Sequence, residues 1–219
     1  RVCVVGSANI DLTFRTSRFP KPGETVTGHA LHQGMGGKGA NQAVAAARLG
    51  ADVTFIACVG KDAFGSAAIE AYGADGIQVS FIRLSEDQPT GTAAILVDDD
   101  AENCIIVIAG ANAGLNSHDV QAASSTIEQS KVVLCQLETP VDAAVEAFRL
   151  ARAANVLTIL TPAPAEHVTQ ELLGLCDVCV PNKTEISTLT GQTIETKADA
   201  LRAADRLRER GVKRIVVTM

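Results

Sequence analysis

Aromatic side chains are scarce in this 219-residue sequence, which contains no Trp, one Tyr and six Phe. Hydrophobic residues nevertheless make up 47% of the sequence, so mostly small aliphatic side chains must form its core. Small aliphatic side chains suit the packing of helices over a sheet. The length allows one large α/β domain or two small ones.

The sequence also lacks a dense block of Lys and Arg, and its formal net charge is -6. Because phosphate backbones attract basic surfaces, we do not expect a nucleic-acid partner. No apolar run approaches the roughly 18–20 residues that a membrane-spanning helix needs, and no signal-peptide pattern is present. We therefore expect a cytoplasmic protein that binds neither nucleic acid nor membrane.

Cysteine spacing gives little support for a metal site. The six cysteines lie mostly in apolar β-like runs, as is typical of buried free thiols in a reducing cytosol; they are residues 3, 58, 104, 135, 176 and 179. Cys176 and Cys179 have CxxC spacing, but no second pair or His set accompanies them, so zinc is not expected. On a strand these two residues would face opposite ways, and we interpret both as core or sheet residues.

Strand-like and helix-like segments alternate along most of the chain. The strand-like segments are residues 2–5, 52–60, 131–137, 156–162, 177–182 and 213–219. The main helix-like segments are residues 40–49, 63–72, 140–155 and 197–210, with shorter ones between them. This alternation predicts an α/β fold with a doubly wound, mostly parallel sheet and helices on both faces.

Two segments interrupt the alternation. Residues 12–33 hold short β-like pieces around the turn FPKPGE, and residues 91–109 hold two β-rich runs joined by the acidic turn DDDAEN. The second segment predicts an antiparallel hairpin. We expect both segments to form a small β-sheet, here called the β-lid, on a single domain over residues 1–219. The acidic turn could bind a metal, but a solvated hairpin tip explains it better.

A glycine cluster, GMGGKG at residues 34–39, precedes a helix-like run. Backbone N–H groups at such a helix start can bind an anion or a polyol, although a flexible loop is the alternative. The cluster matches GxGxxG, but a dinucleotide fingerprint should directly follow the first strand, and this one comes much later. A P-loop is excluded as well, because His32 occupies a glycine position and Gly39 follows Lys38.

Ser117, His118 and Asp119 contain the residue types of a hydrolase triad. Three contiguous residues at a helix start are better explained by capping and by the helix dipole. The four histidines are dispersed along the chain, and no metal-ligand spacing links them.

Six motifs occur in a fixed order: GSANID (6–11), GGKGANQAVAAARLGA (36–51), GANAGL (110–115), QLETP (136–140), TPAPAE (161–166) and PNKTE (181–185). With them the chain resembles the ribokinase-like (PfkB) carbohydrate kinases from Arg1 to Met219. GGKGAN together with QLE and PAPA favours the ribokinase group over fructokinase-like and nucleoside-kinase groups. The resemblance implies phosphorylation of D-ribose at its 5-hydroxyl by ATP, with Mg²⁺, in a homodimer formed through the β-lid. The alternatives are a related sugar or nucleoside kinase, and a non-catalytic sugar-binding or dimerising module.

The resemblance also implies a sugar site. Asn9 and Asp11 are two residues apart, so an extended backbone would point both the same way, toward hydroxyls that they can bind. An Asx turn after the strand is the alternative. Glu138 follows a strand at the sheet edge where ligands bind, although it could be a solvated carboxylate. By resemblance the full set of sugar-binding residues is Asn9, Ile10, Asp11, Gly37, Lys38, Gly39, Ala40, Asn41 and Glu138.

For the nucleotide, the resemblance places Asn182 at the ATP phosphates and Thr218 at the start of the nucleotide-binding loop. Glu185 would help to organise Mg²⁺ through water, which suits an ion that keeps its waters and bridges phosphates. The family's catalytic base is an Asp in a GAGD element, and this element is absent from the 219 residues. We therefore expect a C-terminally incomplete, inactive chain without a catalytic residue, with the K⁺ site and the adenine pocket downstream.

Overall fold

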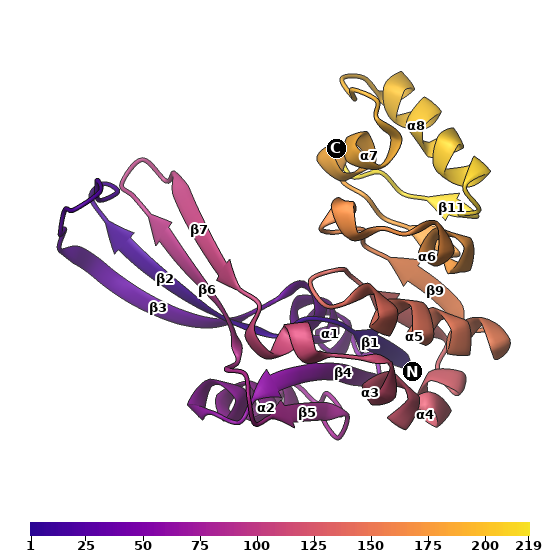
Figure 1. Cartoon of the computed structure of the whole chain (residues 1–219), viewed down its shortest axis with the longest axis horizontal. Coiled ribbons are helices and arrows are strands. Elements are labelled where there is room, and N and C mark those ends of the chain that lie inside the picture. Colours follow the sequence, from indigo (N-terminus) through magenta and orange to yellow (C-terminus); the bar gives the residue numbers. More distant parts are fainter.

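The larger of two sheets has seven parallel strands (Figure 1). The computed structural model describes residues 1–219. The strand order is β11-β10-β9-β8-β1-β4-β5. The strands are β1 (Val2–Val5), β4 (Val53–Gly60), β5 (Ile82–Ser85), β8 (Val132–Cys135), β9 (Leu157–Leu160), β10 (Val178–Cys179) and β11 (Arg214–Ile215). The chain adds β4 and β5 on one side of β1 and the later strands on the other, so the sheet is doubly wound.

Helices cover both faces of this sheet, as predicted. The helices are α1 (Lys38–Arg48), α2 (Ala63–Ala74), α3 (Ser117–Ala122), α4 (Ser124–Glu128), α5 (Val141–Ala153), α6 (Gln170–Leu175), α7 (Lys183–Thr190) and α8 (Lys197–Glu209), with the 3₁₀ turns η1 (Gly110–Gly114) and η2 (Ala165–His167). Alternate residues of β4 enter different cores. Phe55 packs with α1 and α2, whereas Ile56 packs with the core that contains α3, α4 and α5. None of these helices is both long and apolar enough to span a membrane.

The smaller sheet is mixed and projects from one side of the larger one (Figure 1). It contains β2 (Asn9–Thr16), β3 (Gly28–Gly36), β6 (Gly91–Val97) and β7 (Asn103–Ile108) in the order β3-β2-β6-β7. The hairpin of β6 and β7 is antiparallel, as predicted, whereas β2 pairs with β6 in parallel. This β-lid extends beyond the predicted segments, because residues 9–11 pair with residues 34–36.

Local predictions differ from the structure at several points. Helix α1 begins at Lys38 rather than at residue 40, because the carbonyl of Gly37 already accepts the N–H of Asn41 at 2.9 Å. Helix α3 is capped by Asn116, and Asp119 completes the capping box, which confirms capping as the role of this acidic residue.

Five cysteines are buried, but Cys104 lies exposed on β7, so the prediction of buried thiols is wrong for that residue. The prediction for Cys176 and Cys179 is correct in that both belong to the core. They do not occupy opposite faces of one strand, because Cys176 ends α6 and only Cys179 lies on β10. No group of three or more His, Cys, Asp or Glu side chains is arranged to hold a metal ion.

Candidate active site

The candidate site lies where the winding of the larger sheet reverses, between β1 and β8. The two strands are parallel neighbours, so their carboxyl ends lie at the same edge of the sheet. Ser7 and Asn9 follow β1, and Glu138 follows β8. Open α/β sheets bind ligands at this kind of switch point, because the two outgoing chains separate there and leave a crevice.

Glu138 connects three separate segments of the chain. Its Oε2 accepts the hydroxyl of Ser7 at 2.6 Å and the backbone N–H of Lys38 at 2.9 Å, at the start of α1. The Lys38 ammonium lies 3.7 Å from Oε1. The side chain is 26% exposed and held by charge-assisted contacts, so a freely solvated strand-end carboxylate is the wrong interpretation. Its Oε1 remains available to accept a hydroxyl.

The glycines before α1 allow two chain segments to approach closely. Gly37 has φ +88, a conformation that side chains rarely adopt. A Cβ on Gly39 would lie 2.6 Å from the backbone nitrogen of Ser7. The space beside these two glycines is therefore filled by the backbone after β1, and this contact brings the N-terminus of α1 to Glu138.

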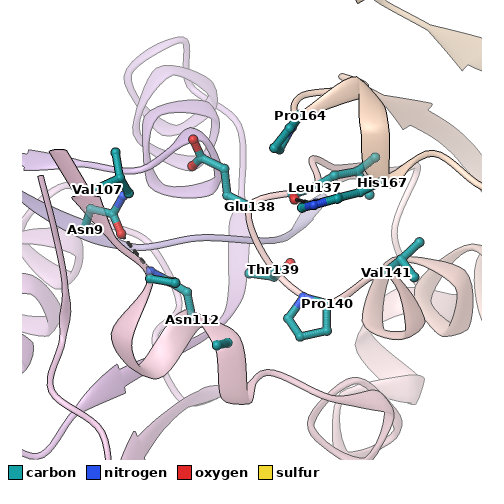
Figure 2. A pocket seen from close by; sticks show the side chains of 12 residues that line it. Asn9, Val107, Asn112, Leu137, Glu138, Thr139, Pro140, Val141, Pro164 and His167 are labelled. Carbon is teal, nitrogen blue, oxygen red and sulfur yellow. Dashed lines mark hydrogen bonds between the residues drawn. The ribbon is translucent and has the colours of Figure 1, made fainter. Parts of the chain in front are cut away.

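Asn9 and Asp11 both lie on β2, so an Asx turn after β1 is the wrong interpretation. Asn9 is buried, and its Oδ1 accepts the side-chain N–H of Asn112 at 2.7 Å (Figure 2). Asp11 is partly buried, and burial, together with repulsion from Glu138, raises the pKa of the Asp11 carboxyl. Asn9 and Asp11 are two residues apart on β2, so both side chains lie on the same face of this strand.

The other predicted sugar-binding residues contribute less to this cluster. Ile10 and Ala40 are fully buried and apolar, so only their backbone could contact a ligand. Asn41 is exposed on α1 and lines a separate hollow with Met35 and Tyr72. The structure therefore does not bring the Asn41 side chain into the main pocket.

The main pocket, about 650 Å³ in volume, opens beside Asn9 and Glu138 (Figure 2). Its size is suitable for a small metabolite. On one side it is lined by the base of the β-lid and η1, and on the other by the loops after β8 and β9. The lining residues are Asn9, Val107, Ala109, Asn112, Ala113, Leu137, Glu138, Thr139, Pro140, Val141, Pro164 and His167.

The three residues predicted at the nucleotide lie together at the same edge of the sheet. Asn182 follows β10 and caps α7, and Thr218 is bridged to it in parallel beyond β11. Asn182 and Glu185 form a reciprocal capping box, in which Asn182 Oδ1 accepts the Glu185 N–H at 2.8 Å and a Glu185 oxygen accepts the Asn182 N–H at 2.8 Å. Capping alone explains both side chains, so their roles toward phosphate and Mg²⁺ stay predictions.

Two polar residues of the site were missed from the sequence. Ser7 is buried and joins Glu138 to the glycine loop, where its hydroxyl also accepts the N–H of Gly39 at 3.3 Å. Asn112 is buried against Ala8 and Asn9. Ser7 belongs to the motif GSANID and Asn112 to the motif GANAGL, so membership of these motifs is the signal that could have suggested buried hydrogen-bonding partners. No spacing rule connects residues that are more than one hundred positions apart.

Comparison with known proteins matches the whole chain, residues 1–219, to the model of the pfkB family carbohydrate kinases. The chain belongs to this family. It is 42% identical to the ribokinase of Mus musculus over 219 residues, which cover 100% of the chain and 68% of that protein. It is 41% identical to the bifunctional ribokinase/ribose-5-phosphate isomerase A of Fructilactobacillus sanfranciscensis, but spans only 41% of that longer protein.

The fold agrees with the family assignment. The structure of Arabidopsis thaliana ribokinase complexed with ribose and ATP superposes with a TM-score of 0.88 at 32% identity. The superposition covers 99% of this chain and 70% of the plant chain. The predicted carbohydrate-kinase fold, with its doubly wound parallel sheet and smaller second sheet, is confirmed.

Proposed function

We propose that the protein transfers the γ-phosphoryl group of ATP to the 5-hydroxyl of D-ribose. The observation that carries the proposal is the junction of Ser7, Lys38 and Glu138 at the sheet's switch point, beside Asn9 and Asp11. The ribokinase relatives support ribose as the sugar. The structure titled with ribose and ATP supports both substrates.

The proposed sugar site offers both hydrogen-bond acceptors and donors. Asp11 and Glu138 would accept hydroxyl protons through their carboxylates, whereas Asn9 and Lys38 would donate to hydroxyl oxygens. A pentose carries several hydroxyls on a small ring, so a mixed set of this kind can bind its two faces. Catalysis would come from positioning of the 5-hydroxyl and from electrostatic stabilisation of the transferred group.

On the phosphate side, Asn182 and Thr218 would contact ATP, and Glu185 would hold Mg²⁺ through water. A single carboxylate fits an ion that arrives with the nucleotide and retains its waters, and bound Mg²⁺ would neutralise phosphate charge. The family's GAGD element, which would supply the catalytic base, does not occur among the 219 residues, so none of them is assigned that role. The free buried thiols favour a cytosolic location.

We also propose that the protein is a homodimer formed through the β-lid. Leu31, Phe14 and Leu96 are paired across the lid, so their side chains share one face, and Ile106 lies on the same face. Ile106 on β7 is 63% exposed and Leu31 on β3 is 59% exposed, so large aliphatic side chains are exposed on both outer strands of this face. A second copy of the β-lid would bury this face.

The test is an ADP-release assay on the polypeptide that the gene encodes, with D-ribose, 2-deoxy-D-ribose, D-fructose and adenosine as acceptors. We expect the largest kcat/KM for D-ribose, with ribose 5-phosphate identified as the product. A higher kcat/KM for adenosine or fructose would establish the related-kinase alternative instead. Ribose binding without ADP release would establish the non-catalytic alternative. The 219 residues alone should release no ADP above background.

A further inference from the structure

Asn112 lies in η1, within the GANAGL motif, and has no assigned role in the proposed reaction. It is 1% exposed, although it lines the pocket beside Asn9. Nearly all of its hydrogen-bonding capacity is directed at the chain after β1. Its Oδ1 accepts the N–H of Ala8 at 2.8 Å, and its Nδ2 donates to the carbonyl of Ala8 at 3.1 Å and to Asn9 Oδ1 at 2.7 Å.

These bonds determine which way both side-chain amides point. The N–H of Ala8 can only donate, so the atom of Asn112 that faces it must be the oxygen. The Asn112 nitrogen then faces Ala8 and Asn9, and the atom of Asn9 that faces this nitrogen must be an acceptor. The Asn9 oxygen is therefore committed to Asn112, and its NH₂ group is the part left for other partners (Figure 2).

The surrounding backbone leaves room for this arrangement and for little else. A Cβ on Gly91 would lie 2.2 Å from Asn112 Nδ2 and 2.3 Å from Asn9 Oδ1. The turn that holds Asn112 is itself fixed, because the N–H of Ala111 donates to the carbonyl of Pro89 at 2.7 Å. Asn9 is only 5% exposed, so it has little freedom to reorient on its own.

We propose that Asn112 is a positioning residue that fixes the Asn9 amide as a hydrogen-bond donor toward the sugar. This inference rests on the proposed function, and it deepens that function by assigning the polarity of one subsite. The group of the sugar that faces Asn9 is a hydroxyl acting as an acceptor, whereas the groups that face Asp11 and Glu138 act as donors.

Asn112→Asp tests the proposal with almost no change in shape. A carboxylate can still accept from Ala8 N–H, but it cannot donate to Asn9, so the Asn9 amide should turn its NH₂ toward Asp and present its oxygen to the sugar. We expect the KM for D-ribose to rise about tenfold, the equivalent of one lost hydrogen bond, with kcat within about twofold. Asn116→Asp is the matched control, because this half-buried helix cap does not line the pocket and a carboxylate accepts the N–H groups of His118 and Asp119 as well as the amide does, so the KM should not change.

Analogues of ribose separate a subsite effect from a general one. KM is measured with D-ribose and with analogues that each lack one hydroxyl other than the 5-hydroxyl. For the analogue that lacks the hydroxyl facing Asn9, Asn112→Asp and the parent should have equal KM values, whereas the tenfold difference should persist with the others. An equal KM increase for every analogue would mean a merely structural role and would overturn the proposal.

Asn9→Asp keeps the test decisive if Asn112→Asp does not fold. It preserves an acceptor for Asn112 but replaces the donor toward the sugar, so the KM for ribose should again rise about tenfold or more. An unchanged KM would overturn the proposal.

Hydrogen exchange of the Asn112 side-chain amide, followed by NMR, is independent of substrate. Both protons should be protected in the parent, and exchange at the rate of a free amide would overturn the assignment. If the parent phosphorylates no pentose while these protons are protected, the proposed function is wrong but the Asn112–Asn9 contact is correct.

Discussion

The Ser7 hydroxyl donates to Glu138 at 2.6 Å, although 131 positions separate the two residues in the sequence. The same hydroxyl accepts the N–H of Gly39 at 3.3 Å, so Ser7 joins the ends of β1 and β8 to the start of α1. A buried hydroxyl at this position holds a carboxylate in one orientation without neutralising its charge. The orientation of Glu138 therefore depends on a residue that does not itself line the pocket.

Ser7→Ala tests this relationship. The variant leaves Glu138 with the N–H and ammonium of Lys38, so the carboxylate stays in place but becomes less strongly oriented. We expect the KM for ribose to rise several-fold and the free energy of unfolding to fall by about 1–2 kcal/mol, measured by ADP-release kinetics and urea denaturation. Ser66→Ala is the control, since that exposed hydroxyl bonds only to a helix carbonyl. A KM for ribose in Ser7→Ala equal to that of the parent would show that Glu138 does not need the Ser7 hydroxyl.

Gly39→Ala should destabilise the fold, because its Cβ would lie 2.6 Å from the Ser7 backbone nitrogen. Neither backbone segment can move away easily, so we expect a loss of about 1–3 kcal/mol, in the range for overpacked interiors. Gly34→Ala is the matched control from the same cluster. A Cβ there has no atom within 4 Å, so its stability should be unchanged or slightly increased. Equal denaturation midpoints for the two variants would contradict the close-approach explanation.

Asp11 makes the sugar site sensitive to acid. Burial and the charge of Glu138 raise the pKa of Asp11 above its ordinary value of 3.8, and only the ionised carboxylate is a pure acceptor for hydroxyls. The KM for ribose should therefore rise as the pH falls through this raised pKa. Asp11→Asn should weaken ribose binding at pH 7. Its KM should no longer rise as the pH falls through the pKa of Asp11. A parent and variant with parallel pH profiles of KM would exclude Asp11 from the site.

The same raised pKa predicts an opposite effect on stability. Because the folded state holds the Asp11 proton more tightly than the unfolded state, ionisation destabilises the fold as the pH rises through the folded pKa. Asp11→Asn should therefore unfold at an equal or higher temperature than the parent at pH 7. This difference should vanish below the unfolded pKa, where Asp11 is neutral in both states. A variant that is less stable at pH 7 would contradict this assignment of the charge.

Ile106→Lys tests the homodimer. The substitution places a charge on the exposed apolar face of the β-lid, on the outer strand β7, where an ammonium could be buried only at considerable free-energy cost. We expect light scattering to show a dimer for the parent and a monomer for the variant. Leu49→Lys is the control, because Leu49 is 89% exposed at the end of α1 and lies outside that face. A dimeric Ile106→Lys variant would place the interface elsewhere.

Local patterns in the sequence were sufficient for the fold class. Alternating strand-like and helix-like segments predicted the doubly wound sheet, and the runs GTAAILV and CIIVIAG predicted an antiparallel hairpin. Both features depend on residues that are near one another in the chain, so periodicity and turn chemistry reveal them. The ordered motifs also identified the family, because each motif is a short run of consecutive residues that can be recognised without the structure.

The tertiary structure alone decided how the site is assembled. Ser7 and Asn112 carry no local signal for their roles, since Ser7 acts on Glu138 across the β1–β8 junction and Asn112 acts on Asn9 across η1. Asn41 is next to the glycine cluster in sequence, yet helix α1 directs it to a different hollow. Pairing of buried polar groups is set by which strands become neighbours, and strand order is a property of the whole chain. The sequence by itself therefore determined the elements and the family, whereas packing of the sheet determined which polar groups meet and in which orientation.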